Sequence, residues 1–143
     1  MRTDRIKLPQ MNAEVVSKEI GDFIVEQVIR RNCNGCVIGL SGGVDSSTTA
    51  ALVKKAFDEY NNTNPKEKLE LVGYMLPSKV NSPDDAKDGI RIAEMLGIRY
   101  EVKSIEGIVN AFKETNPEAL SVNYHKGNLM SRIRANILHT KSA

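Results

Sequence analysis

The feature that most constrains the fold of this chain is an apolar run that stops at a Ser-Gly-Gly turn and continues at once into a helical pattern. The stretch reads Val37-Ile38-Gly39-Leu40-Ser41-Gly42-Gly43-Val44-Asp45-Ser46. Its first four residues are typical of a short strand that is covered on both faces. Apolar residues recur at helical spacing from Ser46 onward, so the stretch predicts a strand, a glycine turn and a helix.

The rest of the chain repeats this alternation of strands and helices. We expect helices over 12–31, from 46 to the polar residues 61–65, over 82–96, 105–114 and 128–139, and strands over 37–40, 69–76 and 99–104. Ser82 is the expected N-cap of the third helix, and a polar loop is expected over 116–127. This order predicts an α/β fold, a parallel sheet with helices on both faces. Ligands of such sheets bind beyond the carboxyl ends of the strands.

Length and composition favour a single globular domain over 1–143. The chain has 143 residues, of which 41% are hydrophobic and 27% charged. The net charge of +2 is too small to indicate a nucleic-acid partner. There is no apolar signal core at the N-terminus and no run of membrane-spanning length. We therefore expect a cytoplasmic protein with no membrane partner.

Both cysteines lie in one short stretch, Cys33-Asn34-Gly35-Cys36, just before the first expected strand. A C-x-x-C pair can be half of a zinc site or a redox dithiol. No second pair of ligands completes a metal site, and the redox motif opens a helix rather than a strand. We expect two reduced cysteines in and beside a turn.

The Ser-Gly-Gly turn has the features of a phosphate-binding loop. Gly42 and Gly43 lack Cβ atoms, so their backbone can adopt positive φ and approach a ligand closely. The amides that follow open a helix, where unpaired N–H groups and the positive end of the helix dipole favour an anion. Ser41, Ser46 and Ser47 add hydroxyl donors.

Two common phosphate motifs are absent, and an acid distinguishes this loop from both. The G-x-x-x-x-G-K-[ST] motif needs a lysine that is missing here, and the G-x-G-x-x-G fingerprint is missing too. Asp45 would repel phosphate unless it binds a divalent cation, for which Mg²⁺ is the usual choice. The alternative, a plain turn with Asp45 as N-cap, leaves two glycines and three hydroxyls without a purpose. A nucleotide with Mg²⁺ is the favoured ligand.

Ser41-Gly42-Gly43-Val44-Asp45-Ser46 resembles the S-G-G-x-D-S loop of the N-type ATP pyrophosphatases, an adenine nucleotide alpha hydrolase-like, Rossmann-like superfamily. Two further stretches resemble its NAD synthetases, particularly the archaeal ammonia-dependent type. They are Val72-Gly73-Tyr74-Met75-Leu76-Pro77-Ser78-Lys79 and Asn128-Leu129-Met130-Ser131-Arg132-Ile133-Arg134. The resemblance covers the chain from about residue 12 onward.

The resemblance implies an ATP-dependent amidation of deamido-NAD to NAD by ammonia, through an adenylated intermediate, with release of AMP and pyrophosphate. It assigns Asp45 to Mg²⁺ and Arg132 to deamido-NAD, and it implies a homodimer. The implied ATP-binding residues are Gly39, Leu40, Ser41, Gly42, Gly43, Val44, Asp45 and Ser46. Members of the family continue well beyond the point that matches Ala143, so we expect a domain that is incomplete at its C-terminal end, with a second acidic Mg²⁺ ligand missing.

Several assignments stay open at the level of the sequence. Lys79 and Arg134 receive no role, since an exposed loop lysine is usually only solvated and Arg134 lies on a different helix face from Arg132. Another ATP pyrophosphatase, such as a GMP synthetase or a tRNA-thiolating enzyme, is an alternative. A non-catalytic ATP-binding module is a second alternative.

Overall fold

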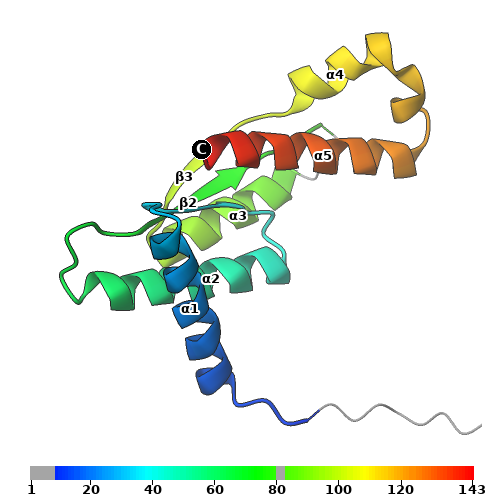
Figure 1. Ribbon diagram of the computed structural model, residues 1–143. Coiled ribbons are helices and arrows are strands. Elements are labelled where there is room, and N and C mark those ends of the chain that lie inside the picture. The colour runs from blue at the N-terminus through cyan, green and yellow to red at the C-terminus, as the bar shows by residue number, and fades with distance from the viewer. Residues whose placement is uncertain (1–8, 80–82) are drawn as a thin grey trace, which may run out of the picture.

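The computed structural model describes residues 9–79 and 83–143, which form a three-stranded sheet covered by helices (Figure 1). The elements in chain order are α1 Ala13–Arg30, β1 Gly35–Gly39, α2 Val44–Asn61, β2 Glu70–Met75, α3 Pro83–Leu96, β3 Arg99–Val102, α4 Glu106–Thr115, the 3₁₀ helix η1 Pro117–Leu120 and α5 Asn123–Lys141.

The sheet has the order β1-β2-β3, and both pairs of strands are parallel. Gly35 is in register with Glu70, and Val72 with Arg99. The three carboxyl ends therefore lie at one edge of the molecule, where the Ser-Gly-Gly turn follows β1. Within the described residues, β1 pairs with β2 alone, so its other side is an edge of the sheet.

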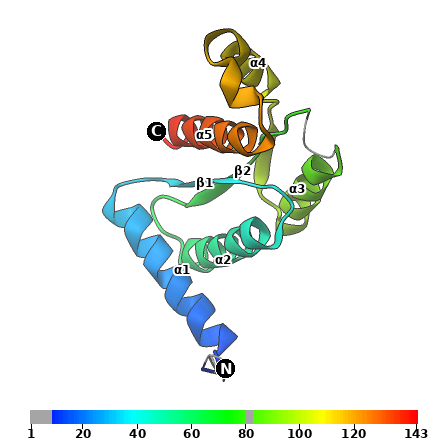
Figure 2. The ribbon, with the colours of Figure 1, turned by 90° about the vertical axis from the view of Figure 1, so that its right-hand side faces the viewer.

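Each face of the sheet has its own hydrophobic core. Figure 2 shows α1, α2 and α3 on one side of the sheet and α4 and α5 on the other. Phe57 of α2 and Ala93 of α3 are buried in the first core, and Ile105 and Leu129 in the second. The predicted α/β class, with a parallel sheet and helices on both faces, is confirmed.

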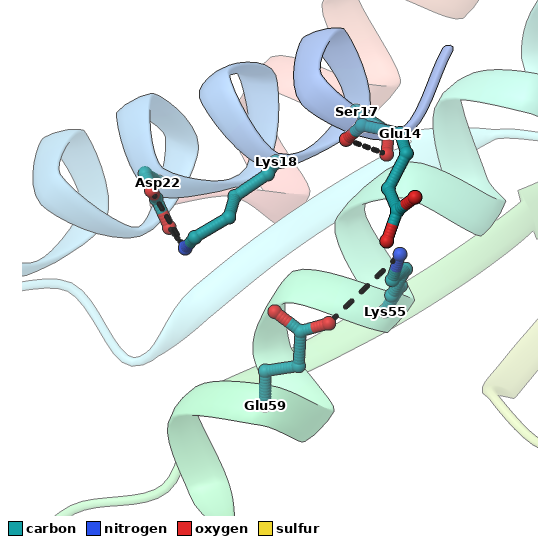
Figure 3. Close-up of polar contacts among 6 residues, drawn as sticks. All are labelled: Glu14, Ser17, Lys18, Asp22, Lys55 and Glu59. Carbon is teal, nitrogen blue, oxygen red and sulfur yellow. Dashed lines mark hydrogen bonds and ion pairs between the residues drawn. The ribbon is translucent and has the colours of Figure 1, made fainter. Parts of the chain in front are cut away.

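The N-terminal helix α1 packs along α2 with a close backbone approach. A Cβ atom at Gly21 would lie 2.9 Å from Cβ of Ala56, so the glycine lets the two helices meet. Charged side chains line the outside of this contact (Figure 3). Lys18 and Asp22 form an ion pair of 2.9 Å on α1, and other surface pairs follow the same i, i+4 spacing on α2.

The predicted elements match the structure except near the C-terminus. The interval 116–127 was expected to be a polar loop, but it contains η1, and α5 begins at Asn123 rather than near residue 128. Asn123 and Gly127 have low helix propensity, which hides the true start of the helix in the sequence. The buried side chains of Leu129, Met130 and Ile133 anchor the helix instead. The predicted N-cap, Ser82, lies outside the described residues.

No helix in the described part of the chain combines the length and the apolar character needed to cross a membrane.

Candidate functional site

The turn after β1 uses the backbone freedom of one of its two glycines, because Gly43 has an extended backbone with a φ of −74°. Leu40 extends the strand pairing, because its N–H donates to the carbonyl of Tyr74 at 2.9 Å. Gly42 then takes a φ of +79°, in the left-handed region that favours glycine. Gly43 is the N-cap residue, and α2 begins at Val44. A single glycine with positive φ thus turns the chain from a strand directly into a helix.

A network of hydroxyl groups holds the loop closed on itself. The hydroxyls of Ser41 and Ser46 lie 3.2 Å apart, and Ser46 donates to the carbonyl of Gly43 at 3.2 Å. The N–H of Gly43 donates to the Ser41 hydroxyl at 3.3 Å. The serines of the motif therefore fix the loop before any ligand is bound, which lowers the entropy lost on binding.

The amides at the start of α2 form the anion-binding part of the loop. The first N–H groups of a helix have no partner within the helix, and they add to the positive end of its dipole. Asp45 lies in this first turn with an exposed side chain, and its backbone carbonyl accepts from the Thr49 hydroxyl at 2.8 Å. Gly43, not Asp45, is the N-cap, so the Asp45 carboxylate does not cap the helix and complements its dipole from the first turn.

The residues present fit a Mg²⁺ ion held mainly by a bound nucleotide. Mg²⁺ is usually bound through one or two carboxylates, with phosphate oxygens and water completing its shell. Among the described residues, no group of three or more His, Cys, Asp or Glu side chains could hold a metal. Asp45 would supply one ligand, and the remaining ligands would come from phosphate and solvent.

The second serine of the pair, Ser47, is placed differently from Ser46. Within the described part of the chain, its hydroxyl is buried and lacks a hydrogen-bond partner. An unsatisfied buried hydroxyl costs free energy.

A pocket of about 390 Å³ opens directly beside the loop. It lies between the ends of β1 and β2, the start of α3 and one face of α5. It is lined by Gly39, Leu40, Ser41, Tyr74, Met75, Leu76, Pro77, Ala86, Ser131, Arg134, Ala135 and Leu138. A mostly apolar cavity of this size with a few polar groups is typical of a small-molecule site. Of the predicted ATP-binding residues, Gly39, Leu40 and Ser41 line it.

Close packing of α5 against β1 forms one wall of this pocket. A Cβ atom at Gly39 would lie 3.1 Å from Cδ1 of Leu138, so the glycine admits the helix. One turn earlier, Nε of Arg134 donates to the carbonyl of Leu76 at 3.0 Å, at the end of β2. Helix α5 thus spans the carboxyl ends of both strands, and Arg134 lies in the pocket.

Arg132 lies on a different side of α5 from the loop. It lines a second cavity, of about 720 Å³, between α4, η1 and α5, together with residues such as Phe112 and His125. Two residues along a helix turn the side chain by about 200°, which separates Arg132 from Arg134.

Lys79 is exposed, and its backbone N–H donates to Glu106 at 2.9 Å. The structure does not bring Arg132 or Lys79 into the pocket beside the loop.

The sequence reasoning missed the α5 wall of the pocket. Ser131, Arg134, Ala135 and Leu138 recur at the i, i+3, i+4 and i+7 spacing of one helix face. That spacing was visible in the sequence, but small and polar residues gave the stripe no apolar signal. The contact of this helix face with the ends of β1 and β2 identifies it as the pocket wall, and that contact is seen only in the structure.

Neither of the two cysteines forms a disulfide in the structure. Cys33 is exposed and Cys36 is half-buried at the start of β1. Burial, with a smaller contribution from Cys33, raises the pKa of the Cys36 thiol, which disfavours the reactive thiolate. The pair lies at the amino end of β1, whereas the loop follows its carboxyl end.

The parallel sheet and the helix-opening loop define the class of protein, an α/β protein of the Rossmann-like type. The model of the NAD synthase family matches residues 16–143. The chain belongs to this family. It is 39% identical over 128 residues to the NH₃-dependent NAD⁺ synthetase of Methanocaldococcus jannaschii, covering 88% of this chain and 46% of that protein. With the enzyme of the same name from Hyperthermus butylicus it is 37% identical over 139 residues, covering 97% and 47%.

Solved structures agree with this assignment. The fold matches an NH₃-dependent NAD synthetase from Campylobacter jejuni with a TM-score of 0.78 and 28% identity, over 93% of this chain and 53% of that one. An NMN synthetase from Francisella tularensis matches with a TM-score of 0.78 and 26% identity, over 92% and 50%. The chain therefore spans about half the length of the relatives it matches.

Proposed function

We propose that the chain carries the nucleotide-binding half of an ammonia-dependent NAD synthetase, which converts deamido-NAD to NAD at the expense of ATP. One observation carries the proposal: a glycine loop with an exposed acid opens α2 at the carboxyl end of β1, in a chain that belongs to the NAD synthase family. The family match favours this reaction over that of a GMP synthetase or a tRNA-thiolating enzyme.

The proposed roles follow from the chemistry of the loop. The first amides of α2 and the hydroxyls of Ser41 and Ser46 would bind the pyrophosphate part of ATP. Asp45 would hold Mg²⁺, which neutralises phosphate charge when it is bound. Transfer at phosphorus needs positioning and charge neutralisation rather than a covalent catalyst. The loop is already shaped for that task by the serine network.

Arg132 would bind deamido-NAD, in a protein that we propose to be a cytoplasmic homodimer. A planar guanidinium suits a carboxylate or phosphate group. Arg132 and the loop line different cavities, on different sides of α5. In a homodimer, Arg132 of a second copy would lie close to the loop of the first copy.

The test is an assay of the purified chain with Mg-ATP, ammonia and deamido-NAD, in which NAD is measured by mass spectrometry. Because the chain spans about half the length of its relatives, we expect Mg-ATP binding but little NAD from the chain alone. With the remaining half of a relative added, we expect NAD that requires all three reactants, and no NAD from Asp45→Asn. A parallel reaction with nicotinate mononucleotide separates the proposed reaction from that of the NMN synthetase relative. If a folded chain that binds Mg-ATP forms neither product even with that half added, the catalytic part of the proposal is wrong and a nucleotide-binding module remains.

A further inference from the structure

We propose that Arg134 binds the phosphate chain of the nucleotide, as the cation that the Ser-Gly-Gly loop itself lacks. The inference rests on the proposed function, because it concerns the same ATP site. It gives a role to the arginine that the sequence left unassigned, two residues beyond the arginine that the family resemblance implicates in deamido-NAD binding.

The first observation is the charge of the loop. From Ser41 to Ser47 there is one acid, Asp45, and no lysine or arginine. A phosphate loop with a G-K-[ST] ending brings its own cation to the phosphates. Here the helix dipole and Mg²⁺ would face several phosphate charges, and Asp45 offsets part of the positive charge. A further cation close to the loop would restore the balance.

The second observation is where the structure places a cation. Among the described residues that line the pocket beside the loop, Arg134 is the single charged side chain. Ser41, the first residue of the loop, lines the same pocket. The cavity is mostly apolar, so a charge inside it is screened less than one on the open surface.

The third observation is that Arg134 is held in place. Its Nε donates to the carbonyl of Leu76 at 3.0 Å, and the side chain is half-buried. Helix α5 is itself fixed by the close contact of Leu138 with Gly39 at the end of β1. A planar guanidinium favours paired hydrogen bonds to phosphate oxygens, which the single ammonium group of a lysine does not make.

The experiment measures the affinity of the full chain for ATP and for inorganic tripolyphosphate by calorimetry, in wild type, Arg134→Met and Arg134→Lys. We expect Arg134→Met to weaken both ligands by a similar factor, on the order of tenfold to a hundredfold. Arg134→Lys keeps the charge but loses the fork, so its loss should be smaller for both ligands. Arg91→Met, which removes an exposed arginine from α3, is the control for net charge.

Each other outcome overturns the inference. If Arg134→Met binds ATP as tightly as wild type, Arg134 has no role in the site. If it weakens ATP but leaves tripolyphosphate unchanged, Arg134 shapes the nucleoside part of the pocket through Leu76 and does not bind phosphate. Circular dichroism checks that each variant is folded. If Arg134→Met unfolds, Arg134→Lys provides the test. A tripolyphosphate affinity equal to that of wild type in Arg134→Lys would then show that Arg134 makes no paired hydrogen bonds to phosphate. A wild type that binds neither ligand rejects the proposed function itself.

Discussion

At the scale of single residues, two arginines separated by one isoleucine serve different parts of the molecule. Arg134 lies in the pocket beside the loop, whereas Arg132 lines the cavity under α4. The sequence showed that they lie on different faces of one helix. It could not show which face meets the strand ends, since that depends on the contact between Leu138 and Gly39.

Gly89 is the residue on which the packing of α3 beneath the loop depends. A Cβ atom there would lie 2.8 Å from the carbonyl oxygen of Leu40 and 2.8 Å from Cγ of Met75. We expect Gly89→Ala to lower the free energy of unfolding by about 1–2 kcal/mol, because overpacking outweighs the gain in helix propensity. Chemical denaturation monitored by circular dichroism measures the change.

Gly107 in α4 provides the matched control for this substitution. No heavy atom lies within 4 Å of a Cβ atom built there. Gly107→Ala should therefore raise the free energy of unfolding by up to about 1 kcal/mol. Equal stability changes in the two variants would show that α3 does not press against the end of β1 as described.

At the scale of elements, the sequence predicted those with a strong periodic pattern. The strands and the helices α1 to α4 lie close to the ranges predicted from apolar spacing. The spacing was informative because the apolar side chains of these elements, such as Phe57 and Ala93, are buried in continuous cores. The start of α5 was missed, since its first turns hold polar residues and Gly127. The pocket wall on α5 was missed for a related reason: it is made by tertiary contact and carries no apolar stripe.

The loop was predicted well because its conformation is local. The positive φ at Gly42 follows from its residue type, and the helix opens at Val44, two residues before the expected start at residue 46. The hydroxyl contacts between Ser41 and Ser46 also lie within a few residues. The roles of Asp45 and Arg132 stay predictions, because they concern ligands.

At the scale of the whole molecule, the chain forms a sheet whose loop-bearing strand lies at an edge. Within the described residues β1 pairs with β2 alone, and the chain spans about half the length of its relatives. An unpaired strand edge attracts further pairing. The loop is held by α2, α3 and β2, which are all present, so we expect nucleotide binding not to need that pairing.

The proposed homodimer is tested at the same scale. Tyr124 is 75% exposed beside the cavity that holds Arg132, and Ile108 is 43% exposed there. We expect sedimentation equilibrium to give twice the chain mass of 15.8 kDa, and Tyr124→Asp to shift the equilibrium toward monomer. A wild type that stays monomeric at every concentration tested would contradict the dimer and the shared site with it.

The most direct test of the account is a calorimetric titration of ATP into the folded chain, with and without Mg²⁺. Wild type is compared with Asp45→Asn and with Asp22→Asn, which removes the same charge from the surface of α1. We predict binding that needs Mg²⁺, at least about tenfold weaker in Asp45→Asn and unchanged in Asp22→Asn. Binding that ignores both Mg²⁺ and Asp45, or no binding by a chain with native circular dichroism, would contradict the assignment of the loop as the nucleotide site.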